Sequence, residues 1–281
     1  MRTSVKLTTT ALVTGALALS LAACGSGSTS GSASGSAADA DKPLIVAASP
    51  TPHAQILDFI AKNLAPKVGL KLQVQVVTDY VTPNLAVQDG SADADYFQHL
   101  PYLEDFNKTH GTDLVSVEAV HLEPLGLYSN KVKSAKALAD GATIAVPNDA
   151  TNEGRALKLL ADNGLITLKS DAGITATPDD IASNPKHFKF QEIDAAQLPR
   201  TLSDVDAAVI NGNYALDAHL SPTKDALLLE KAQGNPYANI LAVKAGNQND
   251  PRVKKLAELL HSPQVKQYIE KTFGGAVIPA F

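Results

Sequence analysis

The chain has 281 residues, 44% of them hydrophobic, which is enough to bury a sizeable core in one large domain or two small ones. Its formal net charge is −5 at pH 7, and it contains no basic tract of the kind that binds nucleic acid. No apolar run after the N-terminal segment is long enough to cross a bilayer.

Residues 1–23 have the features of a secretory signal peptide. Arg2 and Lys6 form a basic start, and the apolar segment that follows has about 13 residues, too few to span a bilayer. The segment ends in Leu-Ala-Ala-Cys-Gly, where Cys24 is the only cysteine of the chain. A single cysteine excludes an internal disulfide, and this pattern resembles a bacterial lipobox. We therefore expect Cys24 to carry lipid such as palmitate, and cleavage would bring the net charge to −7.

Residues 24–42 consist almost wholly of Gly, Ser, Ala and Asp. A segment of this composition cannot form a packed core, so it is expected to be a flexible tether. The folded part should then start near residue 43, with a strand-like run at 44–48.

Strand-like and helix-like patterns alternate from there to the end of the chain. Alternating or continuous apolar runs predict strands, and apolar residues spaced three and four apart predict helices. The expected strands cover 44–48, 71–77, a stretch ending near 99, 115–120, 143–146, 188–193, 207–210 and 237–244. The expected helices cover 56–64, 82–90, 101–110, 135–139, 152–165, 197–202, 214–219, 251–261 and 263–272.

This alternation predicts an α/β fold with two doubly wound lobes. Two crossing segments, near 122–128 and 237–244, would join the lobes and form a hinge. The expected bounds are 43–122 together with 242–281 for lobe 1, and 123–241 for lobe 2.

The stretch 142–160 has the pattern of a strand, a tight turn and the start of a helix. Thr151 and Asn152 are suitable N-cap residues, and Gly154 allows another group to approach the backbone closely. Arg155 is unusual, because a cation in the first turn sits against the positive end of the helix dipole. Either it points into solvent, or it forms a receptor for a carboxylate or phosphate.

Other polar and aromatic residues also follow expected strands. In open parallel sheets, ligands bind beyond the carboxyl ends of the strands. Taken singly, such aromatic residues more often belong to the core, and such asparagines are more often turn residues. Their convergence predicts a site in a cleft between the lobes, formed by Tyr80, Phe97, His99, Arg155 and Asn211.

The residue types of this cleft suit a small zwitterion. Arg155 with Asn152 can bind a carboxylate, and the amides of Asn211 and Asn239 can take an ammonium or complete the carboxylate contacts. The aromatic residues add an apolar pocket. Together these features describe a site for a free amino acid with an apolar side chain.

Five short motifs stand in a fixed order along nearly the whole mature chain. They are Tyr-Phe-Gln-His-Leu-Pro-Tyr-Leu from Tyr96, Pro-Asn-Asp-Ala-Thr-Asn-Glu-Gly-Arg-Ala-Leu from Pro147, Gln-Leu-Pro-Arg from Gln197, Val-Ile-Asn-Gly-Asn-Tyr-Ala from Val209 and Pro-Tyr-Ala-Asn from Pro236. With these motifs the chain resembles the NlpA family of methionine-binding lipoproteins, the substrate-binding components of ABC importers.

The resemblance implies a two-domain periplasmic-binding-protein-like fold of type II. It assigns the methionine carboxylate to Arg155 and Asn152, and the thioether pocket to Phe97 and His99. The full set of ligand-binding residues that it implies is Tyr80, Phe97, His99, Asn152, Arg155, Asn211 and Asn239.

One position departs from part of the family. Some members have an aromatic residue before the proline at the first crossing, where this chain has Glu123-Pro124. A carboxylate there either holds the ligand ammonium or lines the hinge. The first expected ligand is L-methionine, and a methionine derivative or a Met-containing dipeptide is the alternative.

An enzyme and a metal receptor are the competing classes. None of the seven histidines forms a metal-ligand spacing such as H-E-x-x-H, and the chain lacks G-x-S-x-G and a P-loop. Asp93 and Asp95 could form an acid–base pair, but solvated or capping roles are expected at these positions. We therefore expect a binding protein without catalytic activity, cofactor or metal.

The sequence thus predicts a monomer on the extracytoplasmic face, held at the cell membrane only by its lipid anchor. It would close around one solute by a hinge motion and deliver that solute to an ABC permease and ATPase complex. No nucleic-acid partner is expected.

Overall fold

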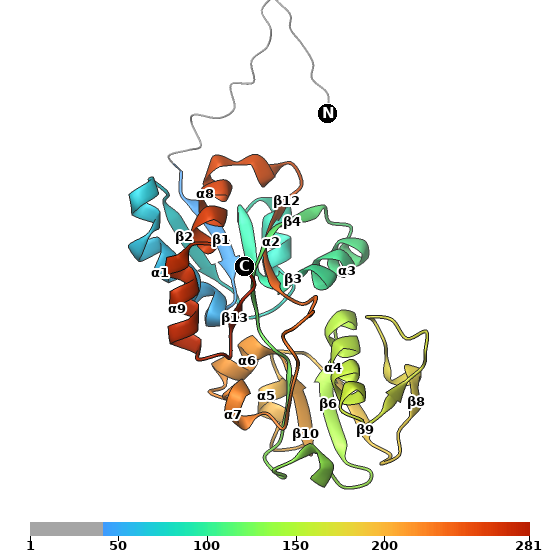
Figure 1. The fold of residues 1–281 in the computed structure, drawn as a ribbon. Helices are drawn as coiled ribbons and strands as arrows, with labels where there is room; N and C mark the ends of the chain where they lie inside the picture. Colours follow the sequence, from blue (N-terminus) through green and yellow to red (C-terminus); the bar gives the residue numbers. More distant parts are fainter. Residues whose placement is uncertain (1–41) are drawn as a thin grey trace, which may run out of the picture. The chain divides into compact units, whose positions relative to one another are not determined.

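The computed structural model describes residues 42–281 (Figure 1). The predicted signal peptide, the predicted lipidation site Cys24 and nearly all of the predicted tether lie outside the described residues. Within the described part of the chain, no helix combines the length and the apolar character needed to cross a membrane.

The secondary structure follows the predicted alternation closely. The strands are β1 (Leu44–Ala48), β2 (Leu72–Val76), β3 (Ala94–His99), β4 (Leu114–Leu122), β5 (Gly126–Tyr128), β6 (Thr143–Pro147), β7 (Thr167–Leu168), β8 (Ile181–Ser183), β9 (Lys189–Ile193), β10 (Ala207–Ile210), β11 (Leu228–Leu229), β12 (Asn239–Lys244) and β13 (Ile278–Pro279). The helices are α1 (Gln55–Asn63), α2 (Thr82–Asp89), α3 (Leu100–His110), α4 (Ala150–Asp162), α5 (Leu198–Thr201), α6 (Gly212–Asp217), α7 (Pro222–Asp225), α8 (Pro251–Leu260) and α9 (Pro263–Phe273). Short helical turns are η1 (Pro50–Ala54), η2 (Ala65–Val68), η3 (Ala135–Ala137), η4 (Pro178–Asp180) and η5 (Asn247–Asn249).

Two main sheets carry the fold. The first has the order β13-β4-β12-β3-β1-β2, in which β1 is parallel to β2 and β3 while β12 is antiparallel to β3 and β4. The second has the order β11-β5-β10-β6-β9, in which β6 is parallel to β9 and β10 while β5 is antiparallel to β10. Each sheet is therefore mixed. In each sheet, the parallel strands are those expected from the predicted alternation of strands and helices. The strand that follows each crossing, β5 or β12, is antiparallel to its neighbours.

The chain passes between the two sheets twice. β4 ends in the first sheet and β5 starts in the second, and β11 ends in the second sheet before β12 starts in the first. The connecting segments are therefore 123–125 and 230–238. The predicted lobe bounds stay a proposal, and the sheet to which each strand belongs supports them with one exception. The predicted bound at residue 242 would divide β12, whereas all of β12 belongs to the first sheet. Below, lobe 1 and lobe 2 denote the parts built on the first and the second sheet.

Each lobe has its own apolar core. In lobe 1, α1 buries Ile56, Leu57 and Ile60 in a cluster that also contains residues of α8 and α9. In lobe 2, α4 buries Leu157 and Leu160 against the second sheet. Burial of each of these side chains stabilises the fold by about 1.5–3 kcal/mol. The two cores fix the strand ends from which the site residues project.

Candidate ligand-binding site

All seven predicted ligand-binding residues line one cavity between the lobes. The empty space along this cavity, including the part open to solvent, is about 330 Å³. Five further residues line it, Gln98, Tyr102, Glu123, Gly212 and Asn213. The structure thus brings the predicted set together, whereas the role of these residues in binding a ligand stays a prediction.

Strand register explains why residues distant in the sequence meet here. Asn239 is the first residue of β12 and pairs with His99 of β3 on one side and with His121 of β4 on the other. Because β12 is antiparallel to both neighbours, its start lies at their carboxyl ends. Asn211 follows β10 in the same way at the carboxyl edge of the second sheet.

The start of α4 differs from the prediction. The N-cap is Asp149, whose carboxylate accepts a hydrogen bond from the backbone N–H of Asn152, so that Thr151 and Asn152 lie inside the first turn. Asp149 also accepts from the Asn152 side chain, with Nδ2 at 2.9 Å from Oδ1 and 3.0 Å from Oδ2. Arg155 therefore lies in the second turn, away from the positive end of the helix dipole.

A counter-ion that sequence analysis missed holds Arg155. Its Nε and Nη2 donate to the two carboxylate oxygens of Glu230 at 2.9 and 2.5 Å, and Nη2 also donates to the backbone carbonyl of Glu123 at 3.0 Å. The guanidinium carbon lies 4.4 Å from the ring centroid of Tyr237. Arg155 is only 4% exposed, so the alternative that it points into solvent is excluded. These bonds engage Nε and both N–H groups of Nη2, and none of them uses Nη1.

Hydrogen bonds fix the proton position of His99. Its Nδ1 accepts from the backbone N–H of Tyr102, so the neutral ring carries its proton on Nε2 and donates to Asn152 Oδ1 at 3.2 Å. Burial, together with the nearby charge of Arg155, lowers the pKa of His99 to about 3. The same Asn152 oxygen accepts from Asn211 Nδ2 at 3.0 Å. These bonds hold the amide groups of lobe 2 against the histidine of lobe 1.

Aromatic rings close one side of the cavity. Tyr80 lies 5.8 Å from Phe97 and 5.9 Å from Tyr102 between ring centroids. The Tyr80 hydroxyl donates to Asn213 Oδ1 at 2.6 Å, and the Tyr214 hydroxyl donates back to the Thr78 carbonyl at 2.9 Å. Both bonds join lobe 1 to lobe 2, so the cavity is closed on this side by contacts between lobes.

Two buried amide atoms at the cavity have no hydrogen-bond partner within the described residues. They are the acceptor Asn211 Oδ1 and the donor Asn213 Nδ2, and their residues are 6% and 3% exposed. Leaving a buried polar atom unpaired costs about 1–3 kcal/mol, so such atoms are usually satisfied by a ligand or by water. Both residues line the cavity, so a polar ligand bound there is a candidate partner for these two atoms.

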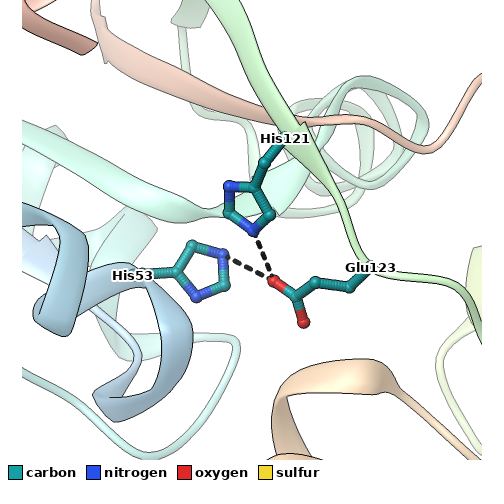
Figure 2. A group of neighbouring side chains, drawn as sticks. All are labelled: His53, His121 and Glu123. Carbon is teal, nitrogen blue, oxygen red and sulfur yellow. Dashed lines mark hydrogen bonds and ion pairs between the residues drawn. The ribbon is translucent and has the colours of Figure 1, made fainter. Parts of the chain in front are cut away.

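Glu123 brings a carboxylate to the same cavity. Its Oε1 lies 2.7 Å from His121 Nε2 and 3.3 Å from His53 Nε2. Figure 2 shows both rings turned toward this oxygen. Gly212 packs against it so closely that a Cβ at that position would lie 2.6 Å from Glu123 Cβ. Lobe 2 can therefore approach Glu123 only because residue 212 has no side chain.

His53, His121 and Glu123 also form a group of potential metal ligands, with ligand atoms within 4.8 Å of one another. Their spacing in the sequence did not reveal this group. Around a tetrahedral zinc ion with bonds of 2.0–2.1 Å, neighbouring ligand atoms would be about 3.3 Å apart. The 2.7 Å contact between His121 and Glu123 is instead the length of a direct hydrogen bond. The arrangement therefore fits a hydrogen-bonded group better than a metal centre.

The alternative acid–base pair is not assembled. Asp93 forms an ion pair with Arg252 at 3.0 Å and accepts from the backbone N–H of Ile45. Asp95 is fully buried and accepts from Gln98 Nε2 at 2.8 Å, so the expectation of a solvated or capping role is wrong for Asp95. Neither aspartate lines the cavity.

Sequence reasoning missed Gln98, Tyr102, Gly212, Asn213 and Glu230. The first two belong to the same motif as Phe97 and His99, and the next two lie in the Asn-Gly-Asn turn that follows β10. Their proximity to predicted residues was the only available signal. Glu230 lies in a connecting segment without any pattern, so nothing in the sequence could have identified it.

Comparison with known proteins gives a consistent set of relatives. The sequence model described as NlpA lipoprotein matches residues 44–281. The methionine-binding lipoprotein MetQ of Bacillus subtilis is 45% identical over 243 residues, covering 85% of this chain and 88% of its own. A nutrient-binding protein from Burkholderia cenocepacia, solved bound to methionine, is 48% identical with a TM-score of 0.82, covering 85% of this chain and all of its own. A lipoprotein from Ruminococcus gnavus is 50% identical with a TM-score of 0.83 at the same coverage.

Proposed function

Because the chain belongs to the NlpA lipoprotein family, we propose that it captures L-methionine in the cavity between its lobes and delivers it to an ABC transporter. The relative from Burkholderia cenocepacia, 48% identical, was solved with methionine bound, and the Bacillus subtilis relative is named as a methionine-binding lipoprotein. The family consists of solute-binding lipoproteins, so the protein acts by binding and not by catalysis.

One observation carries this proposal. A buried acceptor, Asn211 Oδ1, and a buried donor, Asn213 Nδ2, stand unpaired in residues that line the same cavity as the aromatic rings. The zwitterion of an amino acid supplies the missing partners, because its ammonium donates to the acceptor and its carboxylate accepts from the donor. The side chain of the ligand would then lie against the rings of Phe97 and Tyr80.

Charges in the cavity support the same orientation. Arg155 supplies a positive charge for the ligand carboxylate, and its Nη1 is the donor that Glu230 and the Glu123 carbonyl leave unused. Glu123 also lines the cavity, where Asn239 Nδ2 lies 3.4 Å from its Oε1. Its carboxylate suits the ligand ammonium. Of the two roles considered for Glu123, holding the ammonium or lining the hinge, we therefore propose the first.

The contacts between the lobes support capture by closure. Hydrogen bonds from Tyr80 to Asn213 and from His99 to Asn152 link lobe 1 to lobe 2 around the cavity. A ligand that bonds to residues of both lobes stabilises this closed form relative to an open one. A lipid anchor at Cys24 would keep the closed protein near its permease on the extracytoplasmic face.

Native mass spectrometry of the purified protein tests the proposal, followed by calorimetry with L-methionine. We expect a bound mass equal to methionine, or a 1:1 titration with dissociation in the micromolar range or tighter. Methionine derivatives and Met-containing dipeptides serve as competitors. Binding of one of these in preference to methionine, or of no amino acid at all, would refute the proposal.

A further inference from the structure

A hydrogen-bonded chain of buried side chains lies directly behind the cavity. Tyr96 and His121 are fully buried, and Glu123 is 5% exposed. The Tyr96 hydroxyl bonds to His121 Nδ1, and His121 Nε2 bonds to Glu123 Oε1 at 2.7 Å. Only the last member of this chain lines the cavity, so the first two act on a ligand only through Glu123.

The chain has a direction when Glu123 is ionised. A carboxylate can only accept hydrogen bonds, so His121 Nε2 must be the donor. A neutral imidazole has one N–H, which leaves Nδ1 as the acceptor of the Tyr96 hydroxyl hydrogen. Burial lowers the pKa of His121 to about 3, so the ring is neutral at physiological pH. Each bond in the series therefore points toward the carboxylate and stabilises its charged form.

We propose, on the premise of the methionine-binding function, that Tyr96 and His121 are positioning residues that present Glu123 as an anion to the ligand ammonium, so that ligand capture expels a proton from Glu123. The balance is simple. A protonated carboxyl group loses its proton to solvent as the ammonium arrives, and the buried site changes from a neutral group to an ion pair.

The surroundings of Glu123 make this proton exchange available near neutral pH. Burial raises the pKa of Glu123 to about 7, against the lowering influence of Arg155 and the backbone N–H of Asn213. Burial likewise lowers the pKa of His53 to about 4, so this ring adds no charge at pH 7. The titratable or charged groups that act on Glu123 or lie against it are His53, Tyr80, Tyr96, His121, Arg155 and Asp217. An ammonium placed beside these groups favours the anion and lowers the pKa of Glu123 further.

The sign of the pH dependence follows from this pKa. Above pH 7 Glu123 is already ionised, so methionine binds with full affinity and releases no proton. Below pH 7 each binding event must first remove a proton, so affinity falls by about tenfold per pH unit. Below the pKa that Glu123 has in the complex with methionine, affinity no longer falls.

Calorimetry at pH 5.5–8.5, in pairs of buffers that differ in ionisation enthalpy, measures both affinity and proton release. For the natural protein we expect the loss of affinity described above and release of close to one proton per methionine at pH 6. Glu123→Gln should weaken binding at pH 8 and abolish both effects. Methionine binding that is independent of pH, without proton release, would overturn the proposal. Absence of methionine binding at every pH would instead refute the proposed function.

Two substitutions at one position separate positioning from packing. His121→Gln places an amide N–H near the former Nε2 and keeps a donor for Glu123, whereas His121→Asn places it on the Nδ1 side and removes that donor. We expect the methionine affinity of His121→Gln to stay within about threefold of the natural value at each pH. In His121→Asn, the pH at which affinity begins to fall should move upward by about one unit or more. Equal profiles for the two variants would contradict a role in positioning.

Three controls complete the experiment. His110→Asn changes an exposed histidine outside the cavity and should leave the profile unchanged. If His121→Asn fails to fold, Tyr96→Phe removes the first donor of the chain and should shift the pH at which affinity begins to fall in the same direction by a smaller amount. A zinc ion that stays bound to the natural protein in native mass spectrometry, and is lost from His121→Asn, would overturn the proposal, because His121 would then act as a ligand.

Discussion

Glu230 holds the guanidinium of Arg155 through two parallel hydrogen bonds, from Nε to Oε1 at 2.9 Å and from Nη2 to Oε2 at 2.5 Å. The two residues are 75 positions apart and join α4 to the second crossing segment. Because the guanidinium is planar, this bidentate contact sets the plane in which the remaining donor group, Nη1, meets a ligand. The orientation of the predicted carboxylate receptor therefore depends on a residue outside every recognised motif.

Glu230→Gln should reduce methionine affinity although Arg155 is unchanged. The amide offers one acceptor in place of two, so the fork loses its fixed plane and part of its charge compensation. We expect a loss of about tenfold, or about 1.4 kcal/mol, in calorimetry. Glu258→Gln alters an exposed glutamate on α8 and is the matched control. Equal affinities for the two variants would show that Glu230 does not orient Arg155.

Arg155→Ala should abolish methionine binding and also destabilise the fold. The side chains of Arg155 and Glu230 are 5% and 14% exposed, so removal of one partner leaves a buried charge uncompensated, at a cost of about 3–5 kcal/mol. The double variant Arg155→Met/Glu230→Gln removes both charges and should regain most of this stability in urea unfolding without regaining affinity. Near-natural methionine binding by either variant would contradict the receptor role of Arg155.

Phe97→Ala tests the apolar pocket. The ring is 3% exposed and packs near Tyr80 and Tyr102, so its loss should weaken methionine binding by about 1.5–3 kcal/mol. Competition assays should show a smaller loss for alanine, whose side chain does not reach the rings. Phe59→Ala is the control, because Phe59 stacks on Tyr268 and does not line the cavity. Equal losses for methionine and alanine would place the thioether elsewhere.

Asp95→Asn should change how stability depends on pH. Burial raises the pKa of Asp95 from its ordinary value of 3.8 to about 8, so the folded protein keeps a proton that the unfolded chain releases. The stability that Asp95 contributes is therefore complete below pH 3.8. It falls by about 1.4 kcal/mol per pH unit as pH rises from there, and it is lost once pH has passed through 8. Urea unfolding at pH 5 and pH 9 should show a smaller decline for Asp95→Asn than for the natural protein. A decline as steep as that of the exposed-site control Asp140→Asn would refute this.

Cys24→Ala tests the lipid anchor that the sequence predicts. Without the thiol no thioether-linked lipid can form, and within residues 42–281 no helix is long and apolar enough to cross a membrane. We expect the variant to leave the membrane fraction in a cell fractionation assay, whereas Ser26→Ala should stay with the membrane. Retention of Cys24→Ala in the membrane would refute the lipobox assignment.

Local sequence patterns predicted most of the secondary structure because each pattern reflects a nearby physical cause. The apolar spacing in α1 and α4 and the alternation in β2 depend only on which face of an element is buried. The same patterns did not predict β7, β8, β11 and β13, which have two or three residues each and exist only through pairing. They also misplaced the cap of α4, where Asp149 competed with two equally suitable residues.

The sequence by itself determined the family, the alternation that builds two lobes, and the seven residues expected around the ligand, because motifs and periodicity are local properties of the chain. Only the tertiary structure decided which charges meet. Arg155 with Glu230, and Tyr96 with His121 and Glu123, come together through strand register and chain crossings, and spacing along the chain does not encode such contacts. Burial then sets the protonation of these groups, because the cost of a charge depends on the atoms that surround it in the folded protein.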